Sequence, residues 1–392
     1  MRPLDGITVV ALEQAVAAPF ATRQLADLGA RVIKIERPGE GDFARGYDEN
    51  VRGMSAYFVW LNRAKQSLTL DLKHSTGREI MARLLAKADV FIQNLAPGAT
   101  QRLGLGYAAL EPGHPRLIVC DISGYGDSGP YRDKKAYDLL IQSEAGMLSI
   151  TGTPEQPAKV GASIADICTG MYAYSGILTA LLQRGRTGKG SRVEVAMFEA
   201  LCEWMMQPLL YAHFTGNRIA RSGADHVSIV PYGRFSARDG KDVMMGIQNE
   251  REWAQFCEKV LQRPELARDP RFDSNSRRLA SRDELLSIVR EVFATMTAAE
   301  LVERLDAASI ANARMNEMDE VWAHAQLPAR KRWTKMGSPV GAIPVLRPPA
   351  THSDFEPEIG AVPAVGEHTA TILAEVGLAP SEIERLRAAR VV

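Results

Sequence analysis

The sequence has few of the features that mark disulfide frameworks, zinc sites and nucleic-acid-binding proteins. Only four cysteines occur in 392 residues, at Cys120, Cys168, Cys202 and Cys257, and no two form a CxxC pair. This spacing argues against a zinc site or a disulfide framework and is typical of a reducing compartment. Lys plus Arg and Asp plus Glu both number 47, so no net charge attracts nucleic acid or an anionic membrane.

Long apolar runs are absent as well. No run reaches the ~18 residues that a membrane span needs, and the start MRPLDGITVVALEQ has no apolar core of a signal peptide. We therefore expect a cytoplasmic protein that spans no membrane and has small molecules as partners. With 46% hydrophobic residues, a chain of this length predicts roughly two or three domains with ample cores.

The first half of the chain alternates short β-branched runs with helical patterns. Strands are expected at 7–12, 31–36, 67–72, 89–94 and 116–123. Strands that alternate with helices predict a parallel sheet covered on both faces. The fold class is therefore α/β, with a Rossmann-like domain that binds its ligand beyond the carboxyl ends of the strands.

A dinucleotide is the first ligand to consider for such a domain. The segment after the first strand is EQAVAAPF (13–20), which has no glycine where the GxGxxG phosphate loop needs three, although Glu36 ends the second strand. The hypothesis of an NAD-dependent dehydrogenase therefore lacks its phosphate-binding loop.

The pattern changes after about Met206, which predicts a smaller second domain. A turn at Asp239–Gly240 predicts a hairpin within 233–247. Helices are expected near 249–261, 281–296 and 297–308, the last two with capping boxes at Ser281–Glu284 and Thr297–Glu300.

The last stretch of the chain returns to a strand-like segment, GAIPVL (341–346), and closes with a helical hairpin that turns at Gly377 and Pro380. The predicted domains are residues 1–206, a linker with the small domain at 207–325, and a C-terminal part at 326–392.

Asp166 is the strongest candidate for chemistry. It lies in GASIADICTG (161–170), at the start of a long apolar helix that runs to Arg184. The free N–H groups and dipole of a helix N-terminus favour an ionised carboxylate, which is the form that attacks an acyl carbon. The alternative is an ordinary helix N-cap, for which Asp is among the commonest residues.

Eight motifs, spread in order over nearly the whole chain, accompany Asp166. They are LxDLGAxVIKIERPGxGD (25–42), NRAKQSLTLDLK (62–73), QNLAPGATQRLGL (93–105), SGYGDSGPY (123–131), KKAYDLLIQSEAGM (134–147), the stretch around Asp166 (161–170), TGKGSRVEVAMFEA (187–200) and GEHT (366–369). With them the chain resembles the class III CoA-transferases, which include formyl-CoA transferase and carnitine CoA-transferase.

This resemblance implies a fold and a mechanism. A large Rossmann-like domain would be built from both chain ends, with a smaller α+β domain, in an interlocked, ring-like homodimer. Asp166 would form a mixed anhydride with the acyl donor and then an aspartyl-CoA thioester. Coenzyme A would be a cosubstrate, with no permanently bound cofactor and no metal. One departure is that residues 221–233 lack the glycine run that closes over the site in formyl-CoA transferase.

The resemblance also implies roles for other residues. Tyr137 and Gln14 would join Asp166 in catalysis, and the CoA-binding positions would be Ala15, Val16, Arg37, Lys73, Asn94, Arg102 and Lys135. Backbone groups at Gln14–Val16 lie where they could bind a developing oxyanion. Plain surface charges are the alternative for the cations, and a turn cap is the alternative for Asn94.

Two other functions are weighed against CoA transfer. The related α-methylacyl-CoA racemases have a His base where this chain has Tyr137, and Tyr is a poor base near neutral pH, so transfer is preferred to racemisation. A non-catalytic CoA-binding protein is opposed by the retention of Asp166 in its motif.

The identity of the substrates depends on weaker observations. Arg45, Arg52 and Arg221 lie in loops beside the motifs, and one of them could pair with a distal carboxylate. This favours acyl-CoA, possibly succinyl-CoA, as donor and a short dicarboxylate such as mesaconate, itaconate or glutarate as acceptor. Surface arginines are the alternative.

Overall fold

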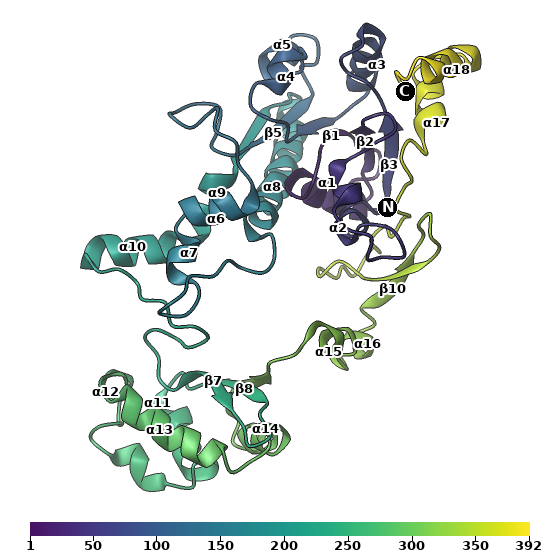
Figure 1. Ribbon diagram of the computed structural model, residues 1–392. Coiled ribbons are helices and arrows are strands. Elements are labelled where there is room, and N and C mark those ends of the chain that lie inside the picture. The colour runs from purple at the N-terminus through teal and green to yellow at the C-terminus, as the bar shows by residue number, and fades with distance from the viewer. The chain divides into compact units, whose positions relative to one another are not determined.

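The computed structural model describes residues 1–392 and divides them into two compact units (Figure 1). The first unit contains residues 1–147, 160–210 and 327–392, so both ends of the chain belong to it. The second unit contains residues 148–159 and 211–326. Residues 148–159 thus lie inside the predicted range 1–206 but belong to the second unit.

The first unit is built on one six-stranded sheet. Its strands are β1 (Thr8–Leu12), β2 (Arg31–Glu36), β3 (Lys65–Thr69), β4 (Val90–Gln93), β5 (Ile118–Ser123) and β6 (Arg192–Ala196). The order is β3-β2-β1-β4-β5-β6 and every pair is parallel, which confirms the predicted α/β class and Rossmann-like sheet. The third strand begins two residues before the predicted start at 67, and β6 was not predicted because its RVEVA pattern mixes charges with valines.

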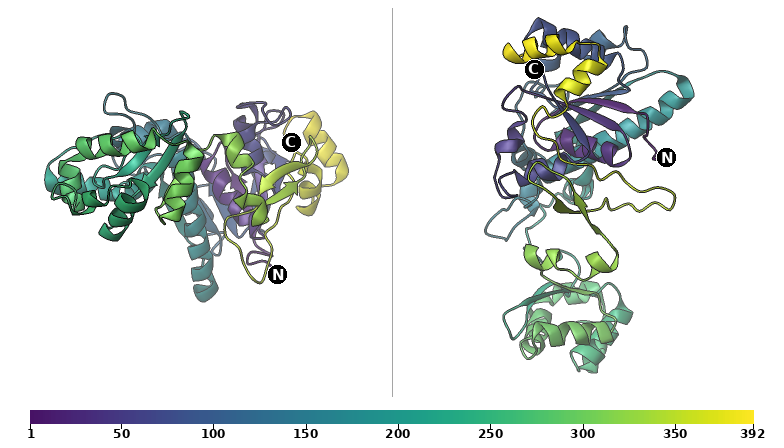
Figure 2. Two further views of the ribbon diagram at one scale, coloured as in Figure 1. Left: turned by 90° about the horizontal axis from the view of Figure 1, so that it is seen from below. Right: turned by 90° about the vertical axis from the view of Figure 1, so that its right-hand side faces the viewer.

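Alternate residues along the strands belong to two separate hydrophobic cores, one on each face of the sheet. Val10 and Ile33 face a core completed by α3 (Ser75–Leu85), α17 (Thr369–Glu375) and α18 (Pro380–Ala388). Val9 and Val32 face a core completed by α1 (Ala17–Asp27) and α8 (Ile164–Thr187). Side chains alternate between the two faces of a strand, and Figure 2 shows α8 and the C-terminal helices on opposite sides of the sheet.

The C-terminal part of the chain returns to the outer strand of the sheet. It first forms the antiparallel pair β10 (Trp333–Met336) and β11 (Ile343–Leu346). The His368 amide then donates to the Ser67 carbonyl at 3.0 Å, and the Thr69 amide donates to Thr369 Oγ1 at 3.1 Å. The predicted closing helical hairpin is confirmed as α17 and α18.

The second unit is a small α+β fold. A three-stranded antiparallel sheet contains β7 (Tyr232–Ser236), β8 (Asp242–Gly246) and β9 (Asn312–Arg314). Its helices are α11 (Glu250–Gln255), α12 (Asn275–Ala280), α13 (Arg282–Phe293) and α14 (Ala298–Ala307). Trp253, Phe256 and Phe293 lie in its core. The predicted hairpin is confirmed, with its turn between β7 and β8.

Of the two predicted capping boxes, one is confirmed and one is wrong. Thr297 and Glu300 make both reciprocal hydrogen bonds at the start of α14. Ser281 makes no capping bond, because it ends α12 as well as preceding α13 and its backbone (φ −107°, ψ 29°) is not the extended conformation of a capping residue.

Shorter helices connect these elements. They are α2 (Ala56–Leu61), α4 (Ala99–Arg102), α5 (Tyr107–Leu110), α6 (Asp138–Glu144), α7 (Met147–Ile150), α9 (Met197–Trp204), α10 (Met206–Thr215), α15 (Met318–Trp322) and α16 (Gln326–Ala329). By length and composition α8 alone is apolar enough to cross a membrane. Its packing against α1 and the sheet identifies it as a core helix instead.

Candidate active site

Asp166 lies in the first turn of α8, the longest helix of the chain. Ser163 occupies the N-cap position of α8. The alternative interpretation of Asp166 as an ordinary N-cap is therefore wrong. The Asp166 side chain is half-buried, and its carboxylate accepts no hydrogen bond from any residue. Buried carboxylates normally have hydrogen-bond partners. Because no residue of the chain donates to it, the Asp166 carboxylate is available to a bound molecule.

The N-terminus of α8 is capped instead by a second carboxylate, that of Asp138 in α6. Its Oδ1 atom accepts from the Ala165 amide at 2.8 Å and from the Asp166 amide at 3.4 Å, while its Oδ2 atom accepts from Gln142 Nε2 at 2.7 Å. Sequence analysis missed this role, because Asp138 is 28 residues from Asp166 and nothing local in the sequence links them.

The pKa of Asp166 is raised to about 7 by burial and, secondly, by the charge of Asp138. The expectation that the helix N-terminus favours the ionised form is therefore wrong for this residue. The physical reason is that burial disfavours the charged form and Asp138 places a second negative charge nearby, while Asp138 also occupies the amides of Ala165 and Asp166. A carboxyl group with a raised pKa is a stronger nucleophile once it is ionised.

The packing of α1 on α8 brings Asp166 to the loop that follows β1. Gly170 lies so close to α1 that an added Cβ would come within 2.6 Å of the Ala17 carbonyl oxygen. Further along, burial and the charge of Asp27 raise the pKa of Tyr174. Since Gln24 of α1 also contacts Met171 of α8, the two helices run in the same direction, and the first turn of α8, with Asp166, lies at the same end of the pair as the start of α1.

This loop is held by bonds to its own backbone. The Gln14 amide donates to Asn94 Oδ1 at 2.9 Å, and Asn94 Nδ2 donates back to the Gln14 carbonyl at 2.8 Å. Ala15 has a left-handed backbone, with φ 61°, and its amide donates to Asp42 Oδ1 at 3.1 Å. The Val16 amide, at the N-terminus of α1, donates no hydrogen bond.

These hydrogen bonds limit which backbone amides of the loop can bind an oxyanion, and they define the role of Asn94. The amides of Gln14 and Ala15 are occupied and cannot also bind an oxyanion, whereas the Val16 amide is available for one. Asn94 acts as a clamp on the loop. Its turn-cap alternative is wrong, since its side chain bonds to residues 80 positions away.

Tyr47 lies within electrostatic range of the Asp166 carboxylate and of Tyr137. Burial, followed by the charges of Asp42, Asp166 and Tyr137, raises the pKa of Tyr47 to about 12, which places Tyr47 near both carboxylates. Sequence analysis missed Tyr47, although it belongs to the segment GDFARGYDEN (41–50) that directly follows one of the motifs. Tyr137 precedes α6 and is 68% exposed, so its side chain reaches solvent.

The predicted CoA-binding cations are all exposed on the first unit. Arg37 and Lys73 follow β2 and β3, and Arg102 ends α4, after β4. Arg37 has only a distant ion pair with Glu40, at 3.8 Å, and the side chains of Lys73 and Lys135 donate no hydrogen bond. Exposed cations that follow the strands of a parallel sheet are suited to bind phosphate groups.

Two arginines considered for a distal carboxylate are already occupied. Arg45 is bonded to Glu36 through Nε at 2.8 Å and Nη2 at 2.7 Å. In the second unit, Arg221 donates to the carbonyls of Thr153 and Pro154 at 2.8 and 2.9 Å. Arg52 makes only one bond, to the Ala342 carbonyl at 3.3 Å.

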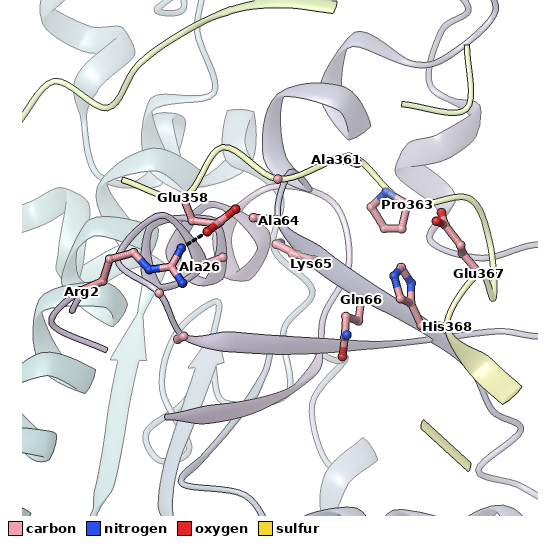
Figure 3. Close-up of a pocket in the computed structure, with 13 residues that line it drawn as sticks. Arg2, Ala26, Ala64, Lys65, Gln66, Glu358, Ala361, Pro363, Glu367 and His368 are labelled. Atoms are coloured by element: carbon pink, nitrogen blue, oxygen red, sulfur yellow. Dashed lines mark ion pairs between the residues drawn. The ribbon is translucent and has the colours of Figure 1, made fainter. Parts of the chain in front are cut away.

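A cavity of ≈ 310 Å³ in the first unit lies apart from the predicted site residues (Figure 3). Its lining includes Gln66, His368 and the ion pair of Arg2 with Glu358, but none of the predicted site residues. No group of three or more His, Cys, Asp or Glu side chains is arranged to hold a metal ion.

Comparison with known proteins decides the family. Residues 4–369 match the model of CoA-transferase family III. The chain belongs to CoA-transferase family III.

Relatives of this family III CoA-transferase match it over most of their length. The mouse protein named succinyl-CoA:glutarate CoA-transferase is 35% identical over 96% of this chain and 87% of its own. The acetyl-CoA:oxalate CoA-transferase of Acetobacter aceti is 36% identical over 86% of each chain. The crystal structure of a CAIB/BAIF family protein from Brucella suis superposes with a TM-score of 0.85 at 36% identity, over 96% of this chain and 99% of the other.

The resemblance stated from the motifs is therefore confirmed, and the enzyme uses CoA as a cosubstrate. The family assignment removes the dehydrogenase hypothesis.

Proposed function

We propose that this enzyme transfers CoA from a short acyl-CoA, such as succinyl-CoA, to a short dicarboxylate through covalent intermediates on Asp166. The observation that carries the proposal is the Asp166 carboxylate itself. It accepts no hydrogen bond, it is half-buried, and it lies in the first turn of α8, at the same end of the packed α1–α8 pair as the free Val16 amide.

The reaction would proceed in two symmetrical halves. An Asp166 oxygen attacks the thioester carbon, the C–S bond breaks, and CoA thiolate and a mixed anhydride result. The thiolate then attacks the Asp166 carbonyl carbon, the donor acid leaves as a carboxylate, and an aspartyl-CoA thioester remains. The acceptor carboxylate repeats these steps in reverse, which regenerates the Asp166 carboxylate and conserves the thioester energy. The free Val16 amide would donate to the oxyanion formed in these steps.

A dicarboxylate acceptor is supported by the names of the relatives, which pair a CoA thioester with glutarate or oxalate. Arg52 is the least occupied of the three loop arginines and would be the partner of a distal carboxylate. Racemisation is the less favoured function, because Tyr137 stands where a second base would be needed and no His occurs within that motif.

We also propose the interlocked homodimer. In the first unit, α9 and the start of α10 expose Trp204, Leu209 and Leu210, and exposed apolar side chains of this size favour burial against a second copy. Sedimentation at nanomolar concentration tests it, because interlocked rings do not dissociate on dilution.

Trapping tests the chemical proposal. The enzyme incubated with succinyl-CoA should carry CoA on the peptide that contains Asp166, as mass spectrometry would detect, and borohydride or hydroxylamine should stop turnover at that residue. A panel of acyl-CoA donors against carboxylic acids identifies the substrates. Full transfer with no adduct and no trapping would contradict the covalent route.

A further inference from the structure

A buried network of charged side chains lies beneath the loop between β1 and α1. Glu13, Lys34 and Lys65 are fully enclosed, with side-chain exposures of 0%. Lys34 Nζ lies 2.8 Å from Asp42 Oδ2 and 3.3 Å from Glu13 Oε1, and Lys65 Nζ lies 2.7 Å from Glu13 Oε1. Buried ion pairs often stabilise a fold no better than apolar side chains of the same volume would. Fold stability alone therefore does not account for the presence of these buried charges.

The network bonds directly to the backbone of the loop. Lys34 Nζ donates to the Glu13 carbonyl at 3.3 Å as well as to Asp42. Asp42 uses its other oxygen to accept from the Ala15 amide at 3.1 Å. A single carboxylate therefore joins a buried ammonium group to the residue before Val16.

Ala15 needs such a restraint. Its φ of 61° lies in the left-handed region, where an L-residue with a Cβ is strained. A strained conformation persists only where its surroundings determine it, and here Asp42 on one side and the Asn94 clamp on the neighbouring Gln14 do so. If Ala15 relaxed, the Val16 amide and the first turn of α1 would change direction.

We infer that Lys34 and Asp42 are positioning residues for acyl transfer, holding Ala15 left-handed so that the Val16 amide stays directed at the reacting group on Asp166. This inference rests on the proposed function of Asp166. It assigns to the network an effect on the rate of the covalent steps in addition to an effect on stability.

The chain supplies a matched control for this inference. Asp27 and Arg63 form another buried pair in the same unit, with two bonds of 2.7 Å, and Arg63 also donates to the Leu346 carbonyl. Neither residue bonds to Gln14, Ala15 or Val16. A variant of this pair perturbs stability without touching the loop.

The test compares Asp42→Asn with Asp27→Asn in the full-length enzyme, using succinyl-CoA and glutarate or the best pair from the substrate panel. We expect Asp42→Asn to lower kcat and the rate of aspartyl-CoA formation about 10- to 100-fold, with the KM for acyl-CoA changed less than about threefold. Asp27→Asn should lower the melting temperature while kcat per folded enzyme stays within about threefold.

A rescue separates positioning from general damage. Glycine adopts the left-handed region without strain, so Ala15→Gly in the Asp42→Asn background should recover about fivefold in kcat with little change in melting temperature. Should Asp42→Asn fold poorly, the neutral pair Lys34→Met with Asp42→Asn leaves no unpaired charge and supplies the same comparison.

Equal kcat values in the Asp42 and Asp27 variants, or no recovery with Ala15→Gly, would overturn the inference. Asp166→Asn keeps the two questions apart. If it abolishes transfer while the Asp42 variants do not slow it, the positioning inference fails and the proposed function stands; if Asp166→Asn retains transfer, the proposed function itself fails.

Discussion

Two clusters of the first unit each hold two carboxylates, and they reach opposite electrostatic results. In the network beneath the β1–α1 loop, Glu13 is fully buried, yet the ammonium groups of Lys65 and Lys34 outweigh that burial and lower its pKa. At the mouth of α8, Asp166 has no cationic partner and a second carboxylate nearby, and its pKa rises to about 7. Burial alone therefore does not make a carboxylate reactive; burial without compensation does.

The largest expected effect comes from removing the uncompensated carboxylate. Asp166→Asn preserves the shape of the side chain but removes the nucleophilic oxygen, so we expect kcat to fall at least about 10³-fold while the fold is kept. Steady-state transfer assays and circular dichroism measure the two quantities. Asp133→Asn, at an exposed carboxylate paired with Arg132, is the control and should stay near the wild-type rate. A folded Asp166→Asn enzyme with near-full activity would mean that the wrong residue stands at the centre of the mechanism.

Breaking the compensated network should lower stability as well as the rate of transfer. Lys34→Met leaves Asp42 and Glu13 buried beside one ammonium group fewer, which should lower the free energy of unfolding by about 3 kcal/mol. Urea denaturation monitored by tryptophan fluorescence provides the measurement. A loss below about 0.5 kcal/mol, as for an ordinary surface substitution, would show that the network is not the compensated counterpart of the Asp166 site.

The exposed cations of the first unit, unlike the buried lysines of the network, should affect the binding of acyl-CoA. Arg37→Ala, Lys73→Ala and Arg102→Ala should each raise the KM for acyl-CoA about tenfold, and leave the KM for the free acid unchanged, because they would bind the phosphates remote from the thioester. Arg387→Ala in α18, an exposed arginine paired with Glu384, is the matched control. Unaltered acyl-CoA kinetics in all three variants would refute the assignment.

Part of this arrangement was predictable from the sequence. The parallel sheet followed from the alternation of strands and helices, and the position of Asp166 at the start of a long helix followed from the apolar pattern after it. Asp138 as the cap of α8 could not be predicted, because the bond depends on how α6 packs beside α8. The left-handed Ala15 and its bond to Asp42 were equally inaccessible, since they join residues 27 positions apart and alanine seldom adopts that conformation.

A substitution of Asp138 separates the effect of its charge on the pKa of Asp166 from the effect of burial. At pH values below the pKa of about 7, Asp166 is protonated and cannot attack, so the rate in the free enzyme should rise with pH through this value. Asp138→Asn keeps an oxygen for the Ala165 amide but removes the second charge. The midpoint of the acid limb of kcat/KM should therefore move below that of the wild type, yet stay above the ordinary 3.8 because burial, the larger cause, remains. A midpoint that does not move would mean that Asp138 is a cap and nothing more.

The smallest expected effect concerns the stability cost of the reactive carboxylate. A folded-state pKa raised from 3.8 to about 7 means that the native state binds more protons than the unfolded state between these values, so its stability decreases as pH rises through this window. Asp166→Asn removes that loss. The variant should therefore be more stable than the wild type at pH 8, by on the order of 1 kcal/mol after allowance for partial solvent exposure, and the difference should vanish near pH 4. Chemical denaturation of both proteins at pH 4, 6 and 8 measures it. A difference that is the same at all three pH values would show that the Asp166 charge does not oppose folding, and the contrast with the compensated network would then lose its energetic basis.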